Sequence, residues 1–207
     1  MATIPASPTQ TEIDAVNFIL GAIGQAPVTT LEATNPDVAI AYDVLINTSK
    51  EVQSEGWTYN TEYHYELVPD SVTKHIAVPS TMIYADISKD DTANRESESV
   101  VRDGKLYDRA NHTYQWERNV NADIVWLFDL DEVPIPVLEF IKNKAAAITS
   151  MQLIGDDGQY QKILQRETYS RAQLLEYECN QGDHSFFGTS AGQHNYISYQ
   201  PYNSLLR

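Results

Sequence analysis

Hydrophobic residues near the N-terminus recur with the period of an α-helix. Apolar side chains are spaced three or four residues apart at Ile13, Val16, Leu20 and Ile23. Thr9 and Glu12 precede this stripe with the spacing of a capping box, in which each residue satisfies a polar group of the other. Gly24 and Pro27 interrupt the pattern. We predict a helix over 10–23.

A second helical stripe follows after a short polar connection. Asn35 is a favoured N-cap residue, and Pro36 suits the first helical position because that position needs no backbone N–H. One face then carries Ala41, Val44, Leu45, Thr48 and Val52. The pattern ends at Gly56, which predicts a second helix over 36–55.

The middle of the chain changes from the helical period to the alternation of β-strands. Residues 57–128 are rich in Tyr, Trp, Val and Thr, the side chains that favour strands. Apolar and polar positions alternate around Tyr63, Tyr65 and Leu67, and again around Ile124, Trp126 and Phe128. We therefore expect an antiparallel β section here.

Two features subdivide this β section. The dipeptide Asp103-Gly104 readily adopts the positive φ angles of a tight turn, and it predicts a hairpin between 100–102 and 105–108. The stretch 88–99 is polar and has no apolar period. We expect this stretch to be an exposed loop.

Helical spacing returns after Pro134 and Pro136 and continues to Gly155. The apolar positions of this third predicted helix are Val137, Leu138, Ile141, Ala145, Ile148 and Met151. A fourth helix is predicted over 158–179, with a stripe formed by Tyr160, Ile163, Leu164, Glu167, Leu174 and Leu175. Because the connection between these two helices is short, we expect them to be antiparallel.

These elements predict an α+β fold, in which an antiparallel bundle of about four helices carries an inserted β lobe. The bundle is expected to comprise 10–56 and 134–179, and the β lobe 57–133. Residues 180–207 lack a regular period and are expected to form an irregular C-terminal arm. The aromatic residues of this arm are candidate partner contacts, since aromatic side chains supply large contact area: Phe186, Phe187, Tyr196, Tyr199 and Tyr202.

Composition adds few chemical possibilities. At 207 residues the chain is long enough to bury a core without a metal or a disulfide. Its one cysteine, Cys179, has no second cysteine to pair with, and the five histidines show no metal-binding spacing. The N-terminus lacks the pattern of a signal peptide, and no apolar run has the length of a membrane span. We therefore expect no cofactor, no metal site and no membrane span.

The chain is strongly acidic, with a formal net charge of −15 at pH 7. Its 14 lysine and arginine residues are scattered, which argues against ordinary nucleic-acid binding because phosphate recognition needs clustered cations. Two interpretations of the acidity remain open. It maintains solubility, or it forms a surface past which DNA slides without sticking.

Several short motifs occur in an order that is similar to one known family. They are Ala15-Val16-Asn17, Ile19-Leu20, Ile23-Gly24, Pro27-Val28, Thr30-Leu31-Glu32, Gly56-Trp57-Thr58, Leu67-Val68-Pro69-Asp70, Leu106-Tyr107-Asp108-Arg109 and Phe128-x-x-Asp131-Glu132-x-Pro134. Together they resemble the tail tubular protein A, or adaptor, family of podovirus phages. The resemblance covers about 10–180, and 180–207 match least well.

The resemblance implies a structural protein of the virion tail, which is present in the host cytoplasm during assembly. In such adaptors twelve copies form a ring below the portal protein, hold the tail nozzle and surround the DNA channel. The helical bundle lies toward the portal, and the β lobe supports tail attachment. If Glu96, Glu98, Asp156 and Asp157 line the channel, their charges would repel DNA phosphates and keep passage fast. DNA would then pass without specific binding.

Adjacent carboxylates raise the alternative of an enzyme. Asp129, Asp131 and Glu132 form one cluster, and glycoside hydrolases use paired carboxylates. Acidic residues before a helix also have a structural role, because they interact favourably with its N-terminal dipole. The sequence contains no phosphate loop, dinucleotide fingerprint or nucleophile elbow. We therefore predict that the chain is not an enzyme.

The alternative function is a tail component that binds or hydrolyses host polysaccharide. The residues that would form a sugar-binding platform are Trp57, Trp116 and Trp126. Large aromatic side chains within a β section are more commonly part of its core. We therefore favour core packing for these tryptophans.

Overall fold

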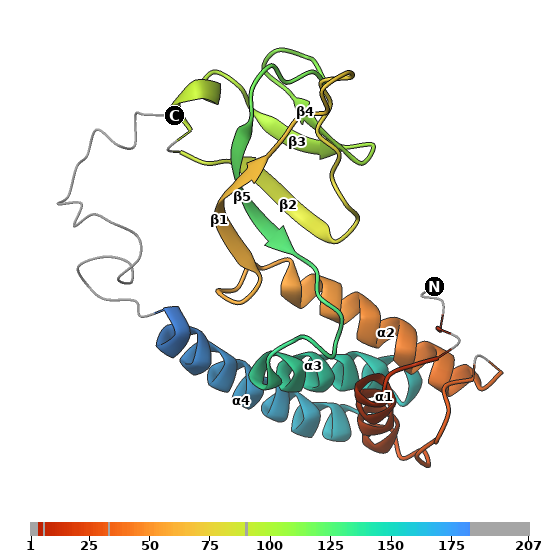
Figure 1. The fold of residues 1–207 in the computed structure, drawn as a ribbon. Helices are drawn as coiled ribbons and strands as arrows, with labels where there is room; N and C mark the ends of the chain where they lie inside the picture. The colour runs from red at the N-terminus through yellow and green to blue at the C-terminus, as the bar shows by residue number, and fades with distance from the viewer. Residues whose placement is uncertain (1–3, 6, 33, 90, 183–207) are drawn as a thin grey trace. The chain divides into compact units, whose positions relative to one another are not determined.

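The computed structural model describes residues 4–5, 7–32, 34–89 and 91–182, and it confirms an α+β fold (Figure 1). The chain divides into two compact units. The helical unit contains the described residues up to Glu55 and Phe128–Gln181. The β unit contains Gly56–Leu127.

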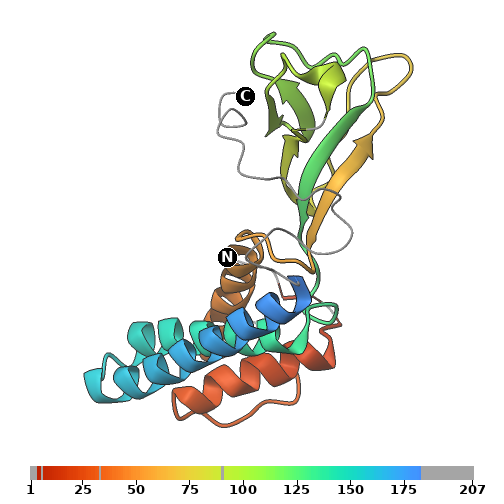
Figure 2. The ribbon, with the colours of Figure 1, turned by 90° about the vertical axis from the view of Figure 1, so that its left-hand side faces the viewer.

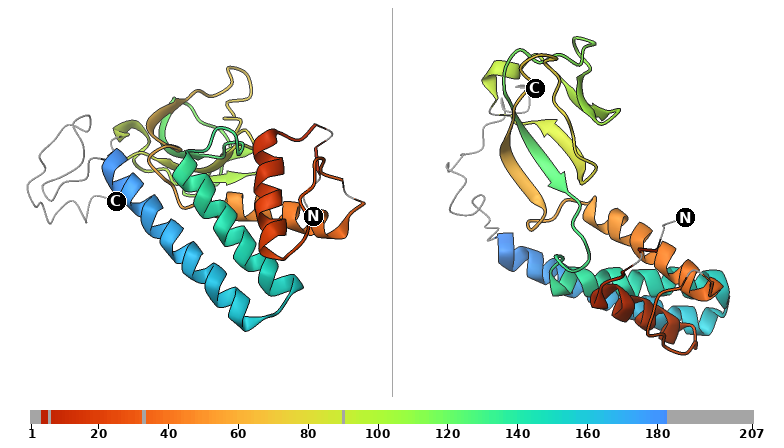
Figure 3. Two further views of the ribbon diagram at one scale, coloured as in Figure 1. Left: turned by 90° about the horizontal axis from the view of Figure 1, so that it is seen from below. Right: turned by 45° about the vertical axis from the view of Figure 1, so that its right-hand side comes forward.

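Four α-helices build the helical unit. They are α1 (Gln10–Ala22), α2 (Pro36–Gln53), α3 (Ile135–Leu153) and α4 (Asp157–Gly182). Helices α1, α2 and α3 pack against one another, and α4 runs alongside α3 in the opposite direction (Figures 2 and 3). Their shared core consists of fully buried side chains from the first three helices, among them Val16, Ile19, Leu20, Val38, Leu45, Val52, Val137 and Ile141.

The first two helices begin as their sequences predict. Thr9 Oγ1 accepts a hydrogen bond from the Glu12 N–H at 3.2 Å, and Glu12 Oε2 accepts one from the Thr9 N–H at 2.8 Å, so the capping box is complete. Asn35 caps α2 by accepting from the Asp37 N–H at 3.1 Å. The other Glu12 oxygen accepts from the Tyr42 hydroxyl at 2.9 Å, which joins α1 to α2. Burial and this hydrogen bond raise the pKa of Tyr42.

The start of α3 differs from the expectation for its acidic neighbours. Pro134 is the N-cap residue, and no side chain caps the helix by a hydrogen bond. Asp131 and Glu132 are exposed in the preceding turn, in which the Glu132 N–H donates to the Asp129 carbonyl at 3.0 Å. They therefore make no capping hydrogen bond, and their expected interaction with the helix dipole would come from their charge and position alone. Asp156 does fill such a role before α4, because its Oδ1 accepts from the Gly158 N–H at 2.9 Å.

Helix α4 is less buried than its predicted stripe implies. Among its described side chains only Ser170 and Leu174 are buried, whereas α3 buries nine residues. Leu175 is 46% exposed although it was predicted to lie on the apolar face. The reason is geometric, since Leu175 lies about 100° around the helix from Leu174 and only one of them faces α3. Met151 near the end of α3 is likewise 57% exposed.

The β unit consists of two antiparallel sheets. A three-stranded sheet has the order β1-β5-β2, from strands Thr61–Leu67, Val120–Trp126 and Met82–Ile87. The hairpin of β3 (Ser99–Arg102) and β4 (Lys105–Asp108) forms around Asp103 and Gly104, whose φ angles are 52° and 67°, as the sequence predicts. The core of the unit is formed by Leu67, Ile76, Val78, Met82, Ala85, Leu106, Trp116, Val120, Ala122 and Ile124.

Strand β1 does not show the simple alternation that was expected. Tyr63 and Tyr65 are both exposed, although they were predicted to share a face with buried Leu67. A register shift between Glu62 and Tyr65 breaks the pairing with β5, and His64 has a positive φ of 58° there. Such a bulge changes the side-chain alternation before it, which accounts for Tyr63. Tyr65 follows the bulge in the same register as Leu67, and its half-exposed ring packs on Trp126.

The stretch 88–99 is more ordered than an exposed loop. It contains a short 3-10 helix, η1 (Thr92–Asn94), and the first residue of β3. Ser88 and Asp91 are buried although both are polar. Most of its other described residues are exposed, as predicted. The prediction missed the two buried residues because polar side chains, rather than apolar ones, hold this segment against the sheet.

Candidate assembly surfaces

An asparagine in α1 fixes the return of the chain after the helix ends. Asn17 Nδ2 donates to the Val28 carbonyl at 2.9 Å, and the Val28 N–H donates to Asn17 Oδ1 at 2.7 Å. Gly24, with a φ of 78°, provides the left-handed residue at the end of α1. The N-terminal motif that carries the family resemblance therefore forms one structural unit, a helix end with its chain reversal.

Two Asp-x-Ala-Asn sequences in the β unit form the same turn. Asp91 Oδ1 accepts from the backbone N–H groups of Ala93 and Asn94, at 3.0 and 3.2 Å, and its Oδ2 accepts from Asn94 Nδ2 at 2.8 Å. Asp108 makes the corresponding bonds to the N–H groups of Ala110 and Asn111, at 2.9 and 3.2 Å, and to Asn111 Nδ2 at 2.7 Å. The repeated tetrapeptide is the sequence signal from which this pair of turns could be predicted.

Both aspartates also connect separate segments. Asp91 Oδ2 accepts from the Asn121 N–H of β5 at 2.9 Å, and Asp108 Oδ1 accepts from the Glu98 N–H at 3.2 Å. Burial alone would raise their pKa values, but the hydrogen bonds led by those from Asn94 and Asn111 outweigh burial, so the pKa of each is lowered. The two carboxylates are thus structural anchors of the β unit.

A serine, a histidine and an aspartate meet beside the bulge in β1. Ser88 Oγ donates to Asp123 Oδ1 at 2.6 Å and lies 2.7 Å from His64 Nδ1. Asp123 Oδ1 also accepts from the His64 backbone N–H at 3.1 Å. A nucleophilic serine gives its proton to histidine, whereas this hydroxyl is directed to the carboxylate and its residue is buried. The cluster therefore holds the bulge in place and is not arranged as a catalytic triad.

The tryptophans are placed mainly as core residues. Trp57 and Trp116 are buried, and the Trp116 indole N–H donates to the Leu106 carbonyl at 3.0 Å. Trp126 is half-buried and packs edge-to-face with Tyr65, with ring centroids 5.7 Å apart. The core interpretation is confirmed for Trp57 and Trp116, which removes the flat exposed platform that a sugar would need.

The four candidate channel acids are all exposed but differ in their contacts. Glu98 pairs with Arg109, whose Nε donates to Glu98 Oε2 at 2.9 Å, so its charge is partly neutralised. Glu96 lies in the turn after η1. Asp156 and Asp157 lie together at the start of α4. The arm candidates Phe186, Phe187, Tyr196, Tyr199 and Tyr202 lie outside the described residues.

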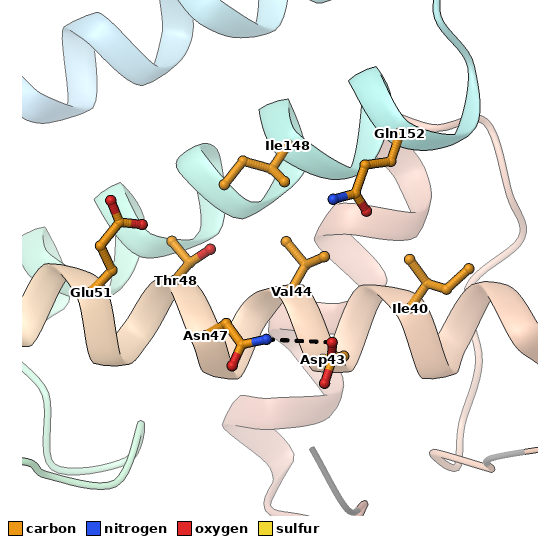
Figure 4. A pocket seen from close by; sticks show the side chains of 8 residues that line it. All are labelled: Ile40, Asp43, Val44, Asn47, Thr48, Glu51, Ile148 and Gln152. Atoms are coloured by element: carbon orange, nitrogen blue, oxygen red, sulfur yellow. Dashed lines mark hydrogen bonds between the residues drawn. The ribbon is translucent and has the colours of Figure 1, made fainter. Parts of the chain in front are cut away.

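A groove of about 380 Å³ runs between α2 and α3 (Figure 4). Ile40 and Val44 of α2 point toward α3, which contributes Ile148, and the polar and acidic side chains stand mainly along α2. The lining residues are Ile40, Asp43, Val44, Asn47, Thr48, Glu51, Ile148 and Gln152. Sequence reasoning did not identify this site, because its residues belong to two helices that are distant in the chain.

The electrostatics of the groove are acidic. Asp43 accepts from Asn47 Nδ2 at 3.3 Å, and Glu51 pairs with Lys144 Nζ at 2.9 Å. Burial raises the pKa of nearby Glu167 on α4; Lys144 opposes this shift and Glu51 adds to it.

In the described residues no group of three His, Cys, Asp or Glu side chains is arranged to hold a metal. No described helix is long and apolar enough to cross a membrane.

Exposed apolar side chains of the helical unit gather on α3, α4 and the turn between them. Every large hydrophobic residue that is exposed among the described residues of this unit belongs to this hairpin: Ile135, Met151, Leu153, Ile154, Tyr169 and Leu175. Three of them, Met151, Leu153 and Ile154, lie close together around the end of α3, and neighbouring exposed apolar residues of this kind mark interaction surfaces in proteins. The hairpin and the groove are therefore the candidate assembly surfaces of the helical unit.

Comparison with known proteins agrees with a structural role. The family model described as tail tubular protein matches residues 13–184. Tail tubular protein A of Klebsiella phage KP34, a podovirus, is 28% identical over 171 residues, which cover 82% of this chain and 88% of that protein. The family consists of structural tail components and is not an enzyme family. The chain therefore belongs to the tail tubular protein family of bacteriophages.

Proposed function

We propose that the chain is an adaptor subunit that joins the phage portal to the tail nozzle. The observation that carries this proposal is the family match over residues 13–184, which includes all four helices except the first turn of α1. Twelve copies would form a closed ring around the DNA channel, with the helical unit toward the portal and the β unit supporting tail attachment. The protein would act by shape alone.

The distribution of exposed apolar residues supports a ring. A closed cyclic ring requires heterologous contacts, in which one surface of each copy meets a different surface of the next. The helical unit offers two such surfaces, the acidic groove and the α3–α4 hairpin. The five arm aromatics, Phe186, Phe187, Tyr196, Tyr199 and Tyr202, would add contacts to a partner.

Mass measurement of the purified chain, alone and mixed with portal protein, tests this function. We expect portal complexes to take up the chain in a fixed ratio, with twelve copies per ring. A stable trimer that binds glycans would contradict an adaptor. Removal of 180–207 should reduce binding to portal or nozzle, and unaltered binding to both would exclude a role for the arm.

The channel hypothesis has its own experiment. Replacing Glu96, Glu98, Asp156 and Asp157 together by lysine should slow DNA ejection, because lysines would attract the phosphates that carboxylates repel. A control replaces Glu66 and Glu117, two exposed acids of the β unit, by lysine and is compared with the D156K/D157K variant, which changes the charge by the same amount. Equal ejection rates for wild type and the first variant would exclude these four residues from the channel wall.

The polysaccharide alternative has weaker support. Burial of Trp57 and Trp116 removes most of the proposed sugar platform. Asp131 is exposed in the turn before α3, where a polysaccharide could reach its carboxylate. Hydrolysis by this residue can therefore be tested directly. Release of reducing sugar by the wild-type ring, lost on Asp131→Asn, would replace the adaptor by a hydrolase as the proposed function.

A further inference from the structure

Charged side chains contribute much of the attachment of helix α4 to the rest of the helical unit. Among the described residues of α4, only Ser170 and Leu174 are buried. Arg171 of α4 lies over the ring of Phe140 on α3, with Cζ 5.0 Å from the ring centre. Its guanidinium also pairs with Glu55 on α2 through two hydrogen bonds of 3.0 and 2.6 Å. The attachment of α4 therefore depends on the charges around it.

Lys144 on α3 is a second cation at the same aromatic ring. Its Nζ lies 5.9 Å from the centre of the Phe140 ring and pairs with Glu51 Oε1 of α2 at 2.9 Å. Because Arg171 pairs with Glu55, each of the two cations already has a carboxylate partner on α2.

Glu167 on α4 adds a third carboxylate to this cluster. It is half-buried and lies one helical turn before Arg171, a spacing at which a glutamate and an arginine commonly form an ion pair. Arg171 pairs with Glu55 instead. Within the described part of the chain, the Glu167 carboxylate has no hydrogen bond or ion pair, although its backbone carbonyl accepts from Ser170 Oγ at 2.8 Å. Glu167 is thus a third carboxylate beside two cations that are already paired.

Charged neighbours on two other helices act on Glu167. Burial raises the pKa of the Glu167 carboxyl, Lys144 on α3 opposes this rise, and Glu51 on α2 adds to it. Arg171 and Glu55 complete the cluster from α4 and α2. When all of these groups are ionised, three carboxylates accompany two cations, and the cluster carries one excess negative charge. A proton on Glu167 removes that charge.

We propose that Glu167 is a pH-sensitive contact of α4, whose protonation tightens α4 against α2 and α3 and whose ionisation loosens it. The inference goes beyond the proposed function, since it requires neither a ring nor a partner. The ionised carboxylate is half-buried beside cations that are paired elsewhere, whereas the neutral carboxyl avoids the cost of burying that charge. Residues 183–207 follow α4 in the chain, so this contact controls how firmly the start of the proposed partner-binding arm is held.

Acidification should therefore strengthen the attachment of α4. The folded-state pKa of Glu167 lies above the value of about 4.3 that a glutamate has in an unfolded chain. Below the unfolded-state pKa, Glu167 is neutral in both states, and the tight contact is fully present. As the pH rises through the folded-state pKa, the carboxylate forms and the contact weakens.

Hydrogen exchange of the α4 backbone amides in the full-length chain tests this contact. After correction for intrinsic exchange rates, protection of α4 in wild type should fall about threefold or more, relative to Glu167→Gln, between about pH 4.5 and pH 7.5. Glu176→Gln is the matched control, because it makes the same chemical change at an exposed position of α4 and should behave like wild type. The same pH dependence in wild type and Glu167→Gln would show that Glu167 does not control α4.

Glu51→Gln tests whether the shared cation is the cause. This change releases Lys144 from its ion pair, so Lys144 becomes available to ionised Glu167, and the pH response of α4 should be reduced. Glu132→Gln, at an exposed acid before α3, should leave the response unchanged. A full response in Glu51→Gln would contradict the proposed competition for Lys144.

Thermal unfolding near pH 4 separates the charge from damage to the packing. Wild type and Glu167→Gln should then have the same melting temperature, since both side chains are largely neutral. If the variant melts at a lower temperature, the amide disturbs the packing, and Glu51→Gln becomes the deciding variant because it leaves Glu167 in place. Loss of the pH response in that variant supports the contact, and its persistence overturns it.

Discussion

The side-chain amide of Gln53 makes two hydrogen bonds to the backbone of Phe128, 75 residues later in the chain. Gln53 Nε2 donates to the Phe128 carbonyl, and the Phe128 N–H donates to Gln53 Oε1, both at 2.9 Å. Gln53 is fully buried at the end of α2, and it also donates to Ser49 Oγ at 3.0 Å. The pair fixes the positions at which the chain leaves and re-enters the helical unit.

Replacement of Gln53 should therefore destabilise the helical unit. Gln53→Ala removes both partners of the Phe128 backbone and opens a cavity, and we expect a loss of about 2–4 kcal/mol in the free energy of unfolding. Gln53→Glu keeps an acceptor but loses the amide donor and buries a charge, so it should also be severe. Urea unfolding followed by circular dichroism measures both. A loss below about 0.5 kcal/mol for Gln53→Ala would mean that the contact is dispensable.

The buried carboxylates of Asp91 and Asp108 predict a pH dependence of stability. Their folded-state pKa values are lowered, so their contribution is present above the unfolded-state pKa of about 3.9 and is lost as the pH falls through the folded-state pKa. The variant D91N/D108N should be less stable than wild type at pH 7. The difference should shrink below about pH 4, where the wild-type carboxylates also become protonated.

Thermal unfolding at several pH values from 7 to 3 checks this prediction. Asp86→Asn is a suitable control because Asp86 lies on β2 of the same unit but is not among the buried carboxylates. A difference between D91N/D108N and wild type that stays constant over this pH range would show that the charge of these groups contributes nothing.

Local signals in the sequence were sufficient for the helix starts and the hairpin. Thr9 and Glu12, Asn35, and Asp103 with Gly104 each determine a structure through contacts within a few residues, so their spacing alone is informative. The same reasoning failed at His64, where the bulge in β1 is held by Ser88 and Asp123 from other strands or loops. No local pattern reports such a contact.

The candidate surfaces were predictable only in part. The amphipathic spacing in α4 indicated a helix correctly, but it could not show that the helix buries just Ser170 and Leu174. Cations of α3 and α4 also stack on Phe18 and Phe140. These are contacts between helices, and the spacing within one helix does not report them. The groove likewise exists only because α2 packs beside α3. The sequence therefore indicated the elements, whereas tertiary packing determined which surfaces remain open.

Two glycines at the end of α1 should respond oppositely to alanine. Gly24 has a φ of 78°, which alanine adopts only with strain, so Gly24→Ala should cost about 1 kcal/mol. Gly21 lies within α1, and a Cβ added there would meet no atom within 4 Å. Gly21→Ala should stabilise the helix by about 0.5–1 kcal/mol, because alanine loses less backbone entropy than glycine. Melting temperatures that shift in the same direction would refute the assignment of the helix end.

Leu174 and Leu175 provide a matched test of how α4 is attached. Leu174 is fully buried, whereas its neighbour is 46% exposed. Among the described residues of α4, Leu174 is the only apolar side chain that is buried. Leu174→Ala leaves a cavity there, and we expect it to lower the free energy of unfolding by about 2–4 kcal/mol. Leu175→Ala should change stability by less than about 0.5 kcal/mol in the isolated chain. Both changes have the same effect on helix propensity, so their difference reports burial alone.

If α4 instead depends mainly on its stacked cations, Arg171→Ala will destabilise the unit more than Leu174→Ala, and hydrogen exchange along α4 will identify the helix as the segment that loosens.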